Sequence, residues 1–160
     1  MKWEGMRLRF RALATSYWVP GDDYLYLIED AVKRYLRDGD LVIVSEKAIA
    51  SAKGLLVDES SIKPGLLARL IARLWMRFIW GYILGPLCHL KPITLKRLRR
   101  YPLPEGARHK QLALSRSGLL QALRHGSEGG IDVSNIPYSY ACLPLEDPQA
   151  EADRIEEHLR

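Results

Sequence analysis

The stretch GIDVSNIPYSYACLPLEDP, from Gly130 to Pro148, combines a glycine-rich loop, a strand and a helix start in close succession. The loop itself extends from Gly126 to Asn135, and Tyr138 to Leu143 has the composition of a strand. Asp147-Pro148 predicts the start of a final helix, because aspartate caps free amide groups and proline suits the first helical turn. This order of elements predicts a mixed fold of helices and strands.

The segments before this stretch support the same fold class. Basic and apolar residues alternate from Met6 to Tyr17, which predicts a half-exposed first strand. Asp23 opens a predicted helix that runs to about Arg37, and Asp38-Gly39-Asp40 ends it. Leu41 to Val44 is a continuous apolar run of the kind found in a buried strand, and Leu55 to Val57 is a second short one. The helix places one apolar face toward the core, formed by Leu27, Ile28, Ala31, Val32, Tyr35 and Leu36.

A long amphipathic helix is predicted in the middle of the chain. It opens at Pro64 and is broken at Gly81, Gly85 and Pro86. Its apolar face consists of Leu67, Leu70, Ile71, Leu74, Trp75, Phe78 and Ile79. A basic connector from Lys91 to Lys110, a short strand at Gln111–Leu114 and a short helix at Gly118–His125 follow. At 160 residues, the chain is expected to form one compact α/β (mixed α+β) domain over residues 1–160.

The apolar stretch from Leu66 to Leu87 is not expected to span a membrane. Arg69, Arg73 and Arg77 lie within it, and each would cost roughly 2.5 to 3.5 kcal/mol near the centre of a bilayer. The N-terminus does not read as a secretion signal, and Cys88 and Cys142 form no CxxC pair. A cytoplasmic location is the simplest expectation, without a disulfide framework or a zinc site.

Positive charge is concentrated in one region. Residues 63–116 contain twelve Lys and Arg and one Glu, a net charge of +11, whereas the whole chain carries +5 and the remainder therefore carries −6. The segment at about 63–116 is thus a basic, largely helical part of the domain. Its densest cluster is Lys96-Arg97-Leu98-Arg99-Arg100-Tyr101, where cations beside an aromatic ring suit a phosphate backbone and a stacked base.

This cluster has several interpretations. The predicted nucleic-acid contacts are Lys91, Lys96, Arg97, Arg99, Arg100, Tyr101, Arg108 and Lys110. They would serve a non-catalytic module that binds RNA or the ribosome. A solvated face is the plainer alternative, and attachment of the aromatic-rich helix (Trp75, Phe78, Trp80 and Tyr82) to an anionic membrane surface is another.

The glycine-rich loop is the main candidate for an anion-binding or nucleotide-binding site. Glycines allow backbone amides to approach a phosphate closely, and hydroxyl and amide side chains add neutral donors. The candidate residues are Ser127, Gly129, Gly130, Asp132, Ser134 and Asn135 in the loop, with Ser45 and Lys47 at the end of the predicted buried strand. The alternatives are a tight turn held by its own polar side chains and a solvated strand end.

Three blocks, in this order, resemble the gamma-glutamyl ligases that act on the deazaflavin coenzyme F-420. They are Pro20-Gly21-Asp22-Asp23, then Asp38 to Lys47 with Ala52-Lys53-Gly54, and then Gly130-Ile131-Asp132-Val133-Ser134-Asn135 running on to Asp147-Pro148. The resemblance implies the N-terminal portion of that fold and an enzyme that adds glutamate to the coenzyme's lactyl-phosphate side chain. It also implies the use of GTP and a divalent metal.

Two departures from the family limit what the resemblance implies. Family members continue past the final helix into a second half with further metal-binding carboxylates, and their middle region is more acidic than residues 63–116 here. We therefore expect a ligase-like domain that is incomplete for catalysis alone, with no catalytic or metal-binding residue assigned. A second ligase half, or self-association, would be the partner that completes the site.

Overall fold

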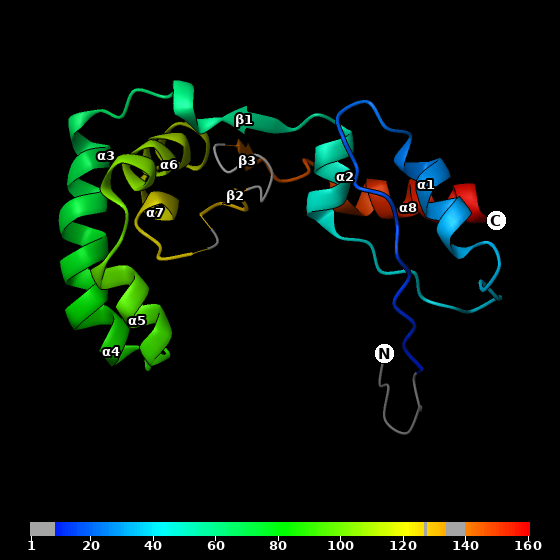
Figure 1. Cartoon of the computed structure of the whole chain (residues 1–160), viewed down its shortest axis with the longest axis horizontal. Helices are drawn as coiled ribbons and strands as arrows, with labels where there is room; N and C mark the ends of the chain where they lie inside the picture. Colours follow the sequence, from blue (N-terminus) through cyan, green and yellow to red (C-terminus); the bar gives the residue numbers. More distant parts are fainter. Residues whose placement is uncertain (1–8, 127, 134–139) are drawn as a thin grey trace.

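A small antiparallel sheet lies between two groups of helices (Figure 1). In the computed structural model, which describes residues 9–126, 128–133 and 140–160, the strand order is β1 (Leu56–Asp58), β3 (Tyr140–Cys142), β2 (Asp132–Val133). Helices α1, α2 and α8 lie on one side of the sheet, and α3 to α7 lie on the other. The chain is thus a single mixed α/β domain, as the sequence predicts.

The helices, in chain order, are α1 (Tyr24–Val32), α2 (Glu46–Ala52), the 3₁₀ helix η1 (Glu59–Ser61), α3 (Leu66–Leu70), the π-helix η2 (Ile71–Leu84), α4 (Gly85–Leu87), α5 (Pro92–Arg99), α6 (Leu103–Ser117), α7 (Leu119–Ala122) and α8 (Pro148–Leu159). The predicted caps are confirmed at two of them. Asp23 accepts the amide protons of Leu25 and Tyr26 at the start of α1, and Asp147 accepts that of Ala150 in α8.

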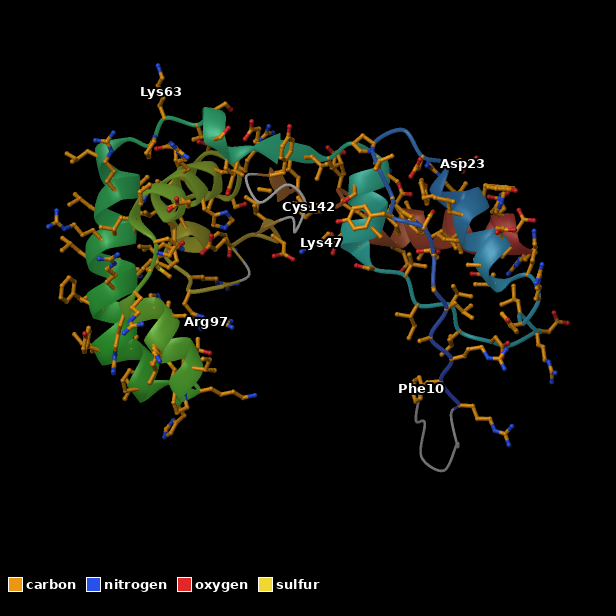
Figure 2. The ribbon with its side chains drawn as sticks, in the orientation of Figure 1. Phe10, Asp23, Lys47, Lys63, Arg97 and Cys142 are labelled. Atoms are coloured by element: carbon orange, nitrogen blue, oxygen red, sulfur yellow. The ribbon has the colours of Figure 1, made fainter. Side chains whose placement is uncertain are left out.

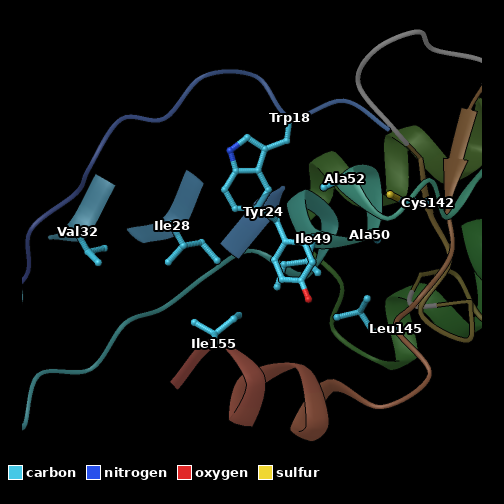
Figure 3. Close-up of a cluster of buried hydrophobic side chains, with 10 residues drawn as sticks. All are labelled: Trp18, Tyr24, Ile28, Val32, Ile49, Ala50, Ala52, Cys142, Leu145 and Ile155. Atoms are coloured by element: carbon cyan, nitrogen blue, oxygen red, sulfur yellow. The ribbon is translucent and has the colours of Figure 1, made fainter. Parts of the chain in front are cut away.

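The first hydrophobic cluster lies among α1, α2 and α8 (Figure 3). Its buried members are Trp18, Tyr24, Ile28, Val32, Ile49, Ala50, Ala52, Cys142, Leu145 and Ile155. The Tyr24 hydroxyl donates a hydrogen bond to Glu151 Oε2 at 2.5 Å, and Lys53 pairs with the other oxygen of the same carboxylate. This buried carboxylate of α8 links three helices, because Tyr24 belongs to α1 and Lys53 lies at the end of α2.

The second cluster lies around η2 and α6. Its buried members are Ile71, Met76, Leu98, Leu112, Ala113, Ala122, Ile131 and Ala141. The indole nitrogens of Trp75 and Trp80 both donate to the carbonyl oxygen of Leu123, at 2.8 and 2.7 Å, which fixes η2 against the end of α7. Gly81 and Gly85 allow α5 to approach η2 and α4, since a Cβ would lie 3.1 Å from Arg99 Cγ at Gly81 and 2.5 Å from Leu95 Cδ2 at Gly85.

Several elements differ from the sequence prediction. Residues 9–17 form no strand, and the rest of the predicted first strand lies outside the described residues. Leu41 to Val44 also forms no strand, so Ser45 precedes the first turn of α2 instead of ending a strand. Helix α1 ends at Val32, five residues before Arg37, and Tyr35 is exposed.

The prediction was also wrong in the middle of the chain. The basic connector consists of α5 and the first half of α6, and Gln111–Leu114 belongs to α6 and not to a strand. The long helix continues through Gly81 to Leu87. The short strand near Leu56, the strand ending at Cys142, the short helix after Gly118 and the final helix are confirmed.

The buried face of the long helix agrees with the predicted one only in part, at the buried Ile71 and the half-buried Trp75 and Ile79. Leu67, Leu70, Leu74 and Phe78 are exposed, whereas the helix buries Ala68, Ile71, Ala72, Met76, Gly81 and Gly85. For Leu74 and Phe78 the physical reason is the π-helical geometry of η2, whose hydrogen bonds join residues five apart and place more residues in each turn than in an α-helix, whereas Leu67 and Leu70 lie in the α-helical α3. A face defined by α-helical spacing therefore drifts away from the core. No helix among the described residues is long and apolar enough to cross a membrane.

The buried face of η2 can be tested by paired truncations on the same helix. We expect Met76→Ala to lower the free energy of unfolding by about 2 to 5 kcal/mol, because Met76 is fully buried and its loss leaves a cavity. Phe78→Ala, at a position that is 54% exposed, is expected to change it by less than about 1 kcal/mol. Urea denaturation of both variants measures the difference, and equal losses of stability would contradict the observed orientation of the helix.

Candidate anion-binding cleft

A cleft of about 420 Å³ lies where α2, β2 and the end of β3 meet. It is lined by Ser45, Glu46, Lys47, Gly130, Asp132, Cys142, Leu143 and Pro144. Segments more than eighty positions apart in sequence therefore form one site. Figure 2 shows Lys47 and Cys142 together at this place, between the two groups of helices.

Lys47 is the cation of the cleft. Its Nζ lies 2.6 Å from Asp132 Oδ2, and its side chain is about one-third exposed while that of Asp132 is about two-thirds exposed. The Lys47 backbone is held from two sides, because its carbonyl oxygen accepts a hydrogen bond from Ser51 Oγ at 2.8 Å and a weak one from Cys142 Sγ at 3.7 Å. The lysine thus extends from a fixed backbone toward a solvent-accessible carboxylate.

Glu46 connects the cleft to the segment after β3. Its Oε1 accepts a hydrogen bond from the Leu145 backbone N–H at 3.0 Å, across the sequence gap between α2 and the turn that leads to α8. A strand through these positions would place Glu46 on the opposite face from Lys47, because side chains alternate along a strand. Because both residues lie in the first turn of α2, both line the cleft.

The floor of the cleft is a tight turn from Glu128 to Ile131. These two residues form a β-bridge, and both central residues have positive φ, 73° at Gly129 and 83° at Gly130. Side chains would also clash there, since a Cβ would lie 2.1 Å from Ser117 Oγ at Gly129 and 2.9 Å from Pro144 Cβ at Gly130. The two glycines are therefore required by the backbone, whatever ligand the turn contacts.

A buried network of charged groups anchors this turn to the second cluster. His109 lies between two carboxylates, with Nδ1 2.5 Å from Glu59 Oε1 and Nε2 2.5 Å from Glu128 Oε2. Lys110 Nζ lies 2.5 Å from Glu128 Oε1 and donates to the Arg124 carbonyl oxygen at 2.7 Å. The network joins η1, α6 and the first residue of the turn, so it fixes the glycine turn beside β1.

The arrangement explains the charge state of His109. Both ring nitrogens face carboxylate oxygens, which requires both to donate protons and the ring to be an imidazolium. Burial alone would lower the pKa of His109, but its hydrogen bonds to Glu128 and Glu59 outweigh burial and raise the pKa to about 9. Burial likewise opposes ionisation of Glu128, yet His109 and Lys110 hold the pKa of Glu128 below its usual range.

Burial is the main cause of the pKa shift of one network member, Lys110, and of one neighbouring residue, Tyr101. Burial lowers the pKa of the fully buried Lys110, although Glu128 partly counteracts it. Burial, followed by the charges of Glu128 and Glu59, raises the pKa of Tyr101, whose ring centroid lies 5.9 Å from Lys110 Nζ. Tyr101 therefore keeps its proton in the folded protein.

The structure brings together some of the residues proposed for anion binding. Ser45, Lys47, Gly130 and Asp132 line the same cleft, whereas Gly129 packs against Ser117 within the turn. Ser127, Ser134 and Asn135 lie outside the described residues. Sequence reasoning did not propose Glu46, Glu59, His109 or Glu128 as site residues. The helix that contains His109 was interpreted as a connector and a strand.

The residues proposed for nucleic-acid contact separate into two groups. Lys91, Lys96, Arg97, Arg99 and Arg100 are exposed at or near α5, and Figure 2 shows Arg97 far from Lys47. Arg108 and Tyr101 are half-buried. Lys110 is completely buried in the charge network, which removes it from the cations that a surface ligand can reach.

A second hollow, of about 480 Å³, lies beside the exposed cations. It is lined by Tyr82, Pro92, Leu95, Lys96, Arg99 and Arg100. The Arg99 guanidinium carbon lies 4.5 Å from the centroid of the Tyr82 ring, and Arg99 Nε donates to the Gly81 carbonyl oxygen at 2.9 Å. Arg99 thus helps to fix α5 on η2 as well as contributing positive charge.

Comparison with known proteins identifies the family. The model of the F420-0:gamma-glutamyl ligase family matches residues 12–160. The chain belongs to this family. It is 36% identical over 156 residues to an uncharacterized protein of Methanocaldococcus jannaschii, covering 96% of the chain and 53% of that protein. It is 31% identical over 142 residues to the coenzyme F420:L-glutamate ligase of Natronomonas pharaonis, covering 87% of the chain and 50% of that enzyme. The chain spans about half the length of both relatives.

The charge network predicts a specific pH dependence of stability. The folded pKa of His109 is about 9, above its ordinary value of 6.5, so its stabilising effect is complete below pH 6.5 and is lost as the pH rises through 9. At about 1.4 kcal/mol for each pH unit, the decrease in stability over this window is on the order of 3 kcal/mol. We expect chemical denaturation at several pH values to show this decline in the wild-type chain.

The matched variant is His109→Gln, which removes the titrating ring from between Glu59 and Glu128. It is expected to be less stable than the wild type at pH 6.5 and to lack the His109 contribution to the pH slope between pH 6.5 and 9. The depressed pKa of Lys110 contributes a slope of opposite sign in both proteins, and loss of His109 also removes one cause of the lowered pKa of Glu128, so the difference between them measures His109 together with its effect on Glu128. Parallel stability curves would exclude the imidazolium assignment.

Proposed function

We propose that the cleft binds the phosphate groups of a nucleotide, as part of a glutamate ligase that needs additional residues for catalysis. The observation that supports this most directly is the convergence of Lys47, Asp132 and the glycine turn on one accessible cleft in a member of the ligase family. Its volume of about 420 Å³ is within the usual range for small-molecule sites. The nucleotide expected from the family resemblance is GTP.

The residues of the cleft suggest how phosphate would bind. The Lys47 ammonium is a compact charge, and an incoming phosphate would compete with Asp132 for it. Gly130 has no side chain, so its backbone can lie close to a bound anion. Asp132, once released from Lys47, would then be available to accept a hydrogen bond from a ligand hydroxyl group.

A divalent metal does not fit the described residues as a site formed by the protein alone. They contain no group of three or more His, Cys, Asp and Glu side chains placed to hold a metal. The carboxylates that line the cleft are already engaged, Glu46 with the Leu145 amide and Asp132 with Lys47. We therefore assign no step to a metal and propose that catalysis requires a second ligase half or self-association.

Substitution of Lys47 tests the proposed phosphate site. Lys47→Gln is expected to weaken GTP binding at least tenfold, because it removes the cation while keeping a polar side chain of similar shape. Isothermal titration of the purified chain with GTP measures the change. Lys33→Gln is the matched control, since Lys33 is an exposed lysine beside α1 that also pairs with an aspartate. Equal binding by all three proteins would rule out the cleft as the site.

A second candidate function is RNA binding through α5. The observation that favours it is the exposure of Lys91, Lys96, Arg97 and Arg100 on and beside α5, where Lys96 and Arg100 line a hollow together with Tyr82. Cations along a helix beside an aromatic ring can contact phosphates and a stacked base. In this role the chain would be a non-catalytic module that associates with RNA or the ribosome.

The triple variant Lys96→Ala, Arg97→Ala and Arg100→Ala tests this second function while leaving Arg99 in its bond to Gly81. We expect it to weaken binding of single-stranded RNA and to reduce the salt dependence, by about 0.7 in log–log slope for each phosphate group that no longer pairs with a cation. The matched control is Lys33→Ala, Arg34→Ala and Arg37→Ala, an exposed basic group near α1. RNA affinity that is insensitive to salt, or equal in both variants, would count against it.

A further inference from the structure

The segment Leu41–Val44, between α1 and α2, has the sequence of a strand but no strand partner among the described residues. Its four residues, Leu-Val-Ile-Val, are of the types enriched in buried strands. Its backbone N–H and C=O groups make no hydrogen bond to any part of the chain that the structure describes. Open backbone groups along an apolar, strand-forming segment are a template for pairing with another polypeptide.

The side chains of this segment alternate as they would in a strand. Val42 and Val44 are partly buried against the first hydrophobic cluster. Leu41 and Ile43 point away from it and are 68% and 85% exposed. One face of the segment is therefore packed on the domain, while the other face and the backbone are open.

The segment Leu41–Val44 lies directly before the cleft residues in the sequence. Val44 directly precedes Ser45, the first of three consecutive residues that line the cleft. At about 3.4 Å per strand residue, a polypeptide paired with Leu41–Val44 would pass within a few residues of Lys47. A partner held there could add side chains to the open side of the cleft.

We propose that Leu41–Val44 is a docking edge for a β-strand from the portion of the ligase fold that this chain does not cover. The two relatives are about twice the length of the matched region, so the family contains a second portion of comparable size. The docked strand would form backbone hydrogen bonds with Leu41–Val44 and would cover Leu41 and Ile43. The proposal rests on the proposed function in one respect: the partner is assigned as the supplier of the residues missing from the cleft.

Pairing with a second copy of the chain is less favourable at this edge. An antiparallel pair of identical segments would form a ladder only four residues long, with Asp40 opposite Ser45 and Asp38 opposite Lys47. A two-stranded ladder of this length is marginal unless further packing supports it. The second portion of the fold could supply such packing together with additional cleft residues, which is why it is the assigned occupant.

Co-expression provides the test. The tagged chain would be produced together with the uncovered segment of the Methanocaldococcus relative, and the two would be purified through the tag. We expect the segment to be retained by the wild-type chain, with at least tenfold less retained by Ile43→Lys and by Ile43→Pro. Proline removes the Ile43 amide, which is unbonded in the free chain, together with the isoleucine side chain, so this variant tests the backbone and side-chain contacts of the docked strand together.

Leu120→Lys is the matched control, because Leu120 is 81% exposed and lies on α7, away from the segment. It is expected to retain the co-expressed segment as well as the wild type does. In hydrogen exchange, the amide of Ile43 is expected to exchange fast in the free chain and to become protected in the complex, because a strand docked on one edge accepts hydrogen bonds from alternate residues. No retention by the wild type, equal loss of retention in all three variants, or self-association alone would each overturn the proposal.

The same proteins separate this proposal from the nucleotide site. Ile43→Lys is expected to lose the partner but to bind GTP as the free wild-type chain does, since Ile43 does not line the cleft. Lys47→Gln is expected to lose GTP and to keep the partner. If the wild-type chain binds GTP but does not retain the partner, the docking edge is wrong. If it retains the partner but does not bind GTP, the nucleotide site is wrong.

Discussion

The antiparallel pairing of β1 with β3 is the constraint on which the rest of the fold depends. It joins segments more than eighty positions apart through the pairs Leu56–Cys142, Val57–Ala141 and Asp58–Tyr140, and Leu143 N–H extends the ladder to the Leu55 carbonyl oxygen. Because side chains alternate along a strand, Leu56 and Cys142 face the first hydrophobic cluster while Val57 and Ala141 face the second. A three-residue ladder thus holds two helical groups on its two faces. It also places the end of β3 beside α2, which creates the cleft.

The charge network imposes a second constraint on the same region. Burying Glu128 and Lys110 is unfavourable unless their charges are matched, and removing one member of such a buried pair costs about 3 to 5 kcal/mol. The matched arrangement exists only when the turn lies against α6 and η1. The positive φ values of Gly129 and Gly130 then allow the chain to reverse directly into β2. The position of the proposed anion site therefore follows from electrostatics in the second cluster as much as from the sheet.

Sequence reasoning succeeded where local chemistry decides the structure. Asp23 and Asp147 act as helix caps because their side chains satisfy amides only two or three residues away. It failed in η2, because the wider turn of a π-helix changes which side chains are buried. Ser45, Lys47 and Asp132 could be proposed from residue type, although Ser45 and Lys47 were assigned to a strand end and lie at a helix start. His109 could not, because its carboxylate partners, Glu59 and Glu128, are fifty and nineteen positions away.

The charge of the middle segment illustrates how structure limits an argument from composition. The net charge of +11 over residues 63–116 treats all cations as equivalent, yet several are committed to the fold. Lys110 neutralises Glu128, Arg77 donates twice to the Tyr101 carbonyl oxygen, and Arg99 lies between Tyr82 and Gly81. Arg77 and Arg99 hold α5 and the residues that follow it against η2 through backbone carbonyl oxygens, whereas Lys110 fixes the glycine turn to α6. The positive potential available to a ligand therefore comes from the cations that remain exposed, which include Arg69, Arg73 and Arg116 as well as those of α5 and its flanks, a smaller set than the sequence indicates.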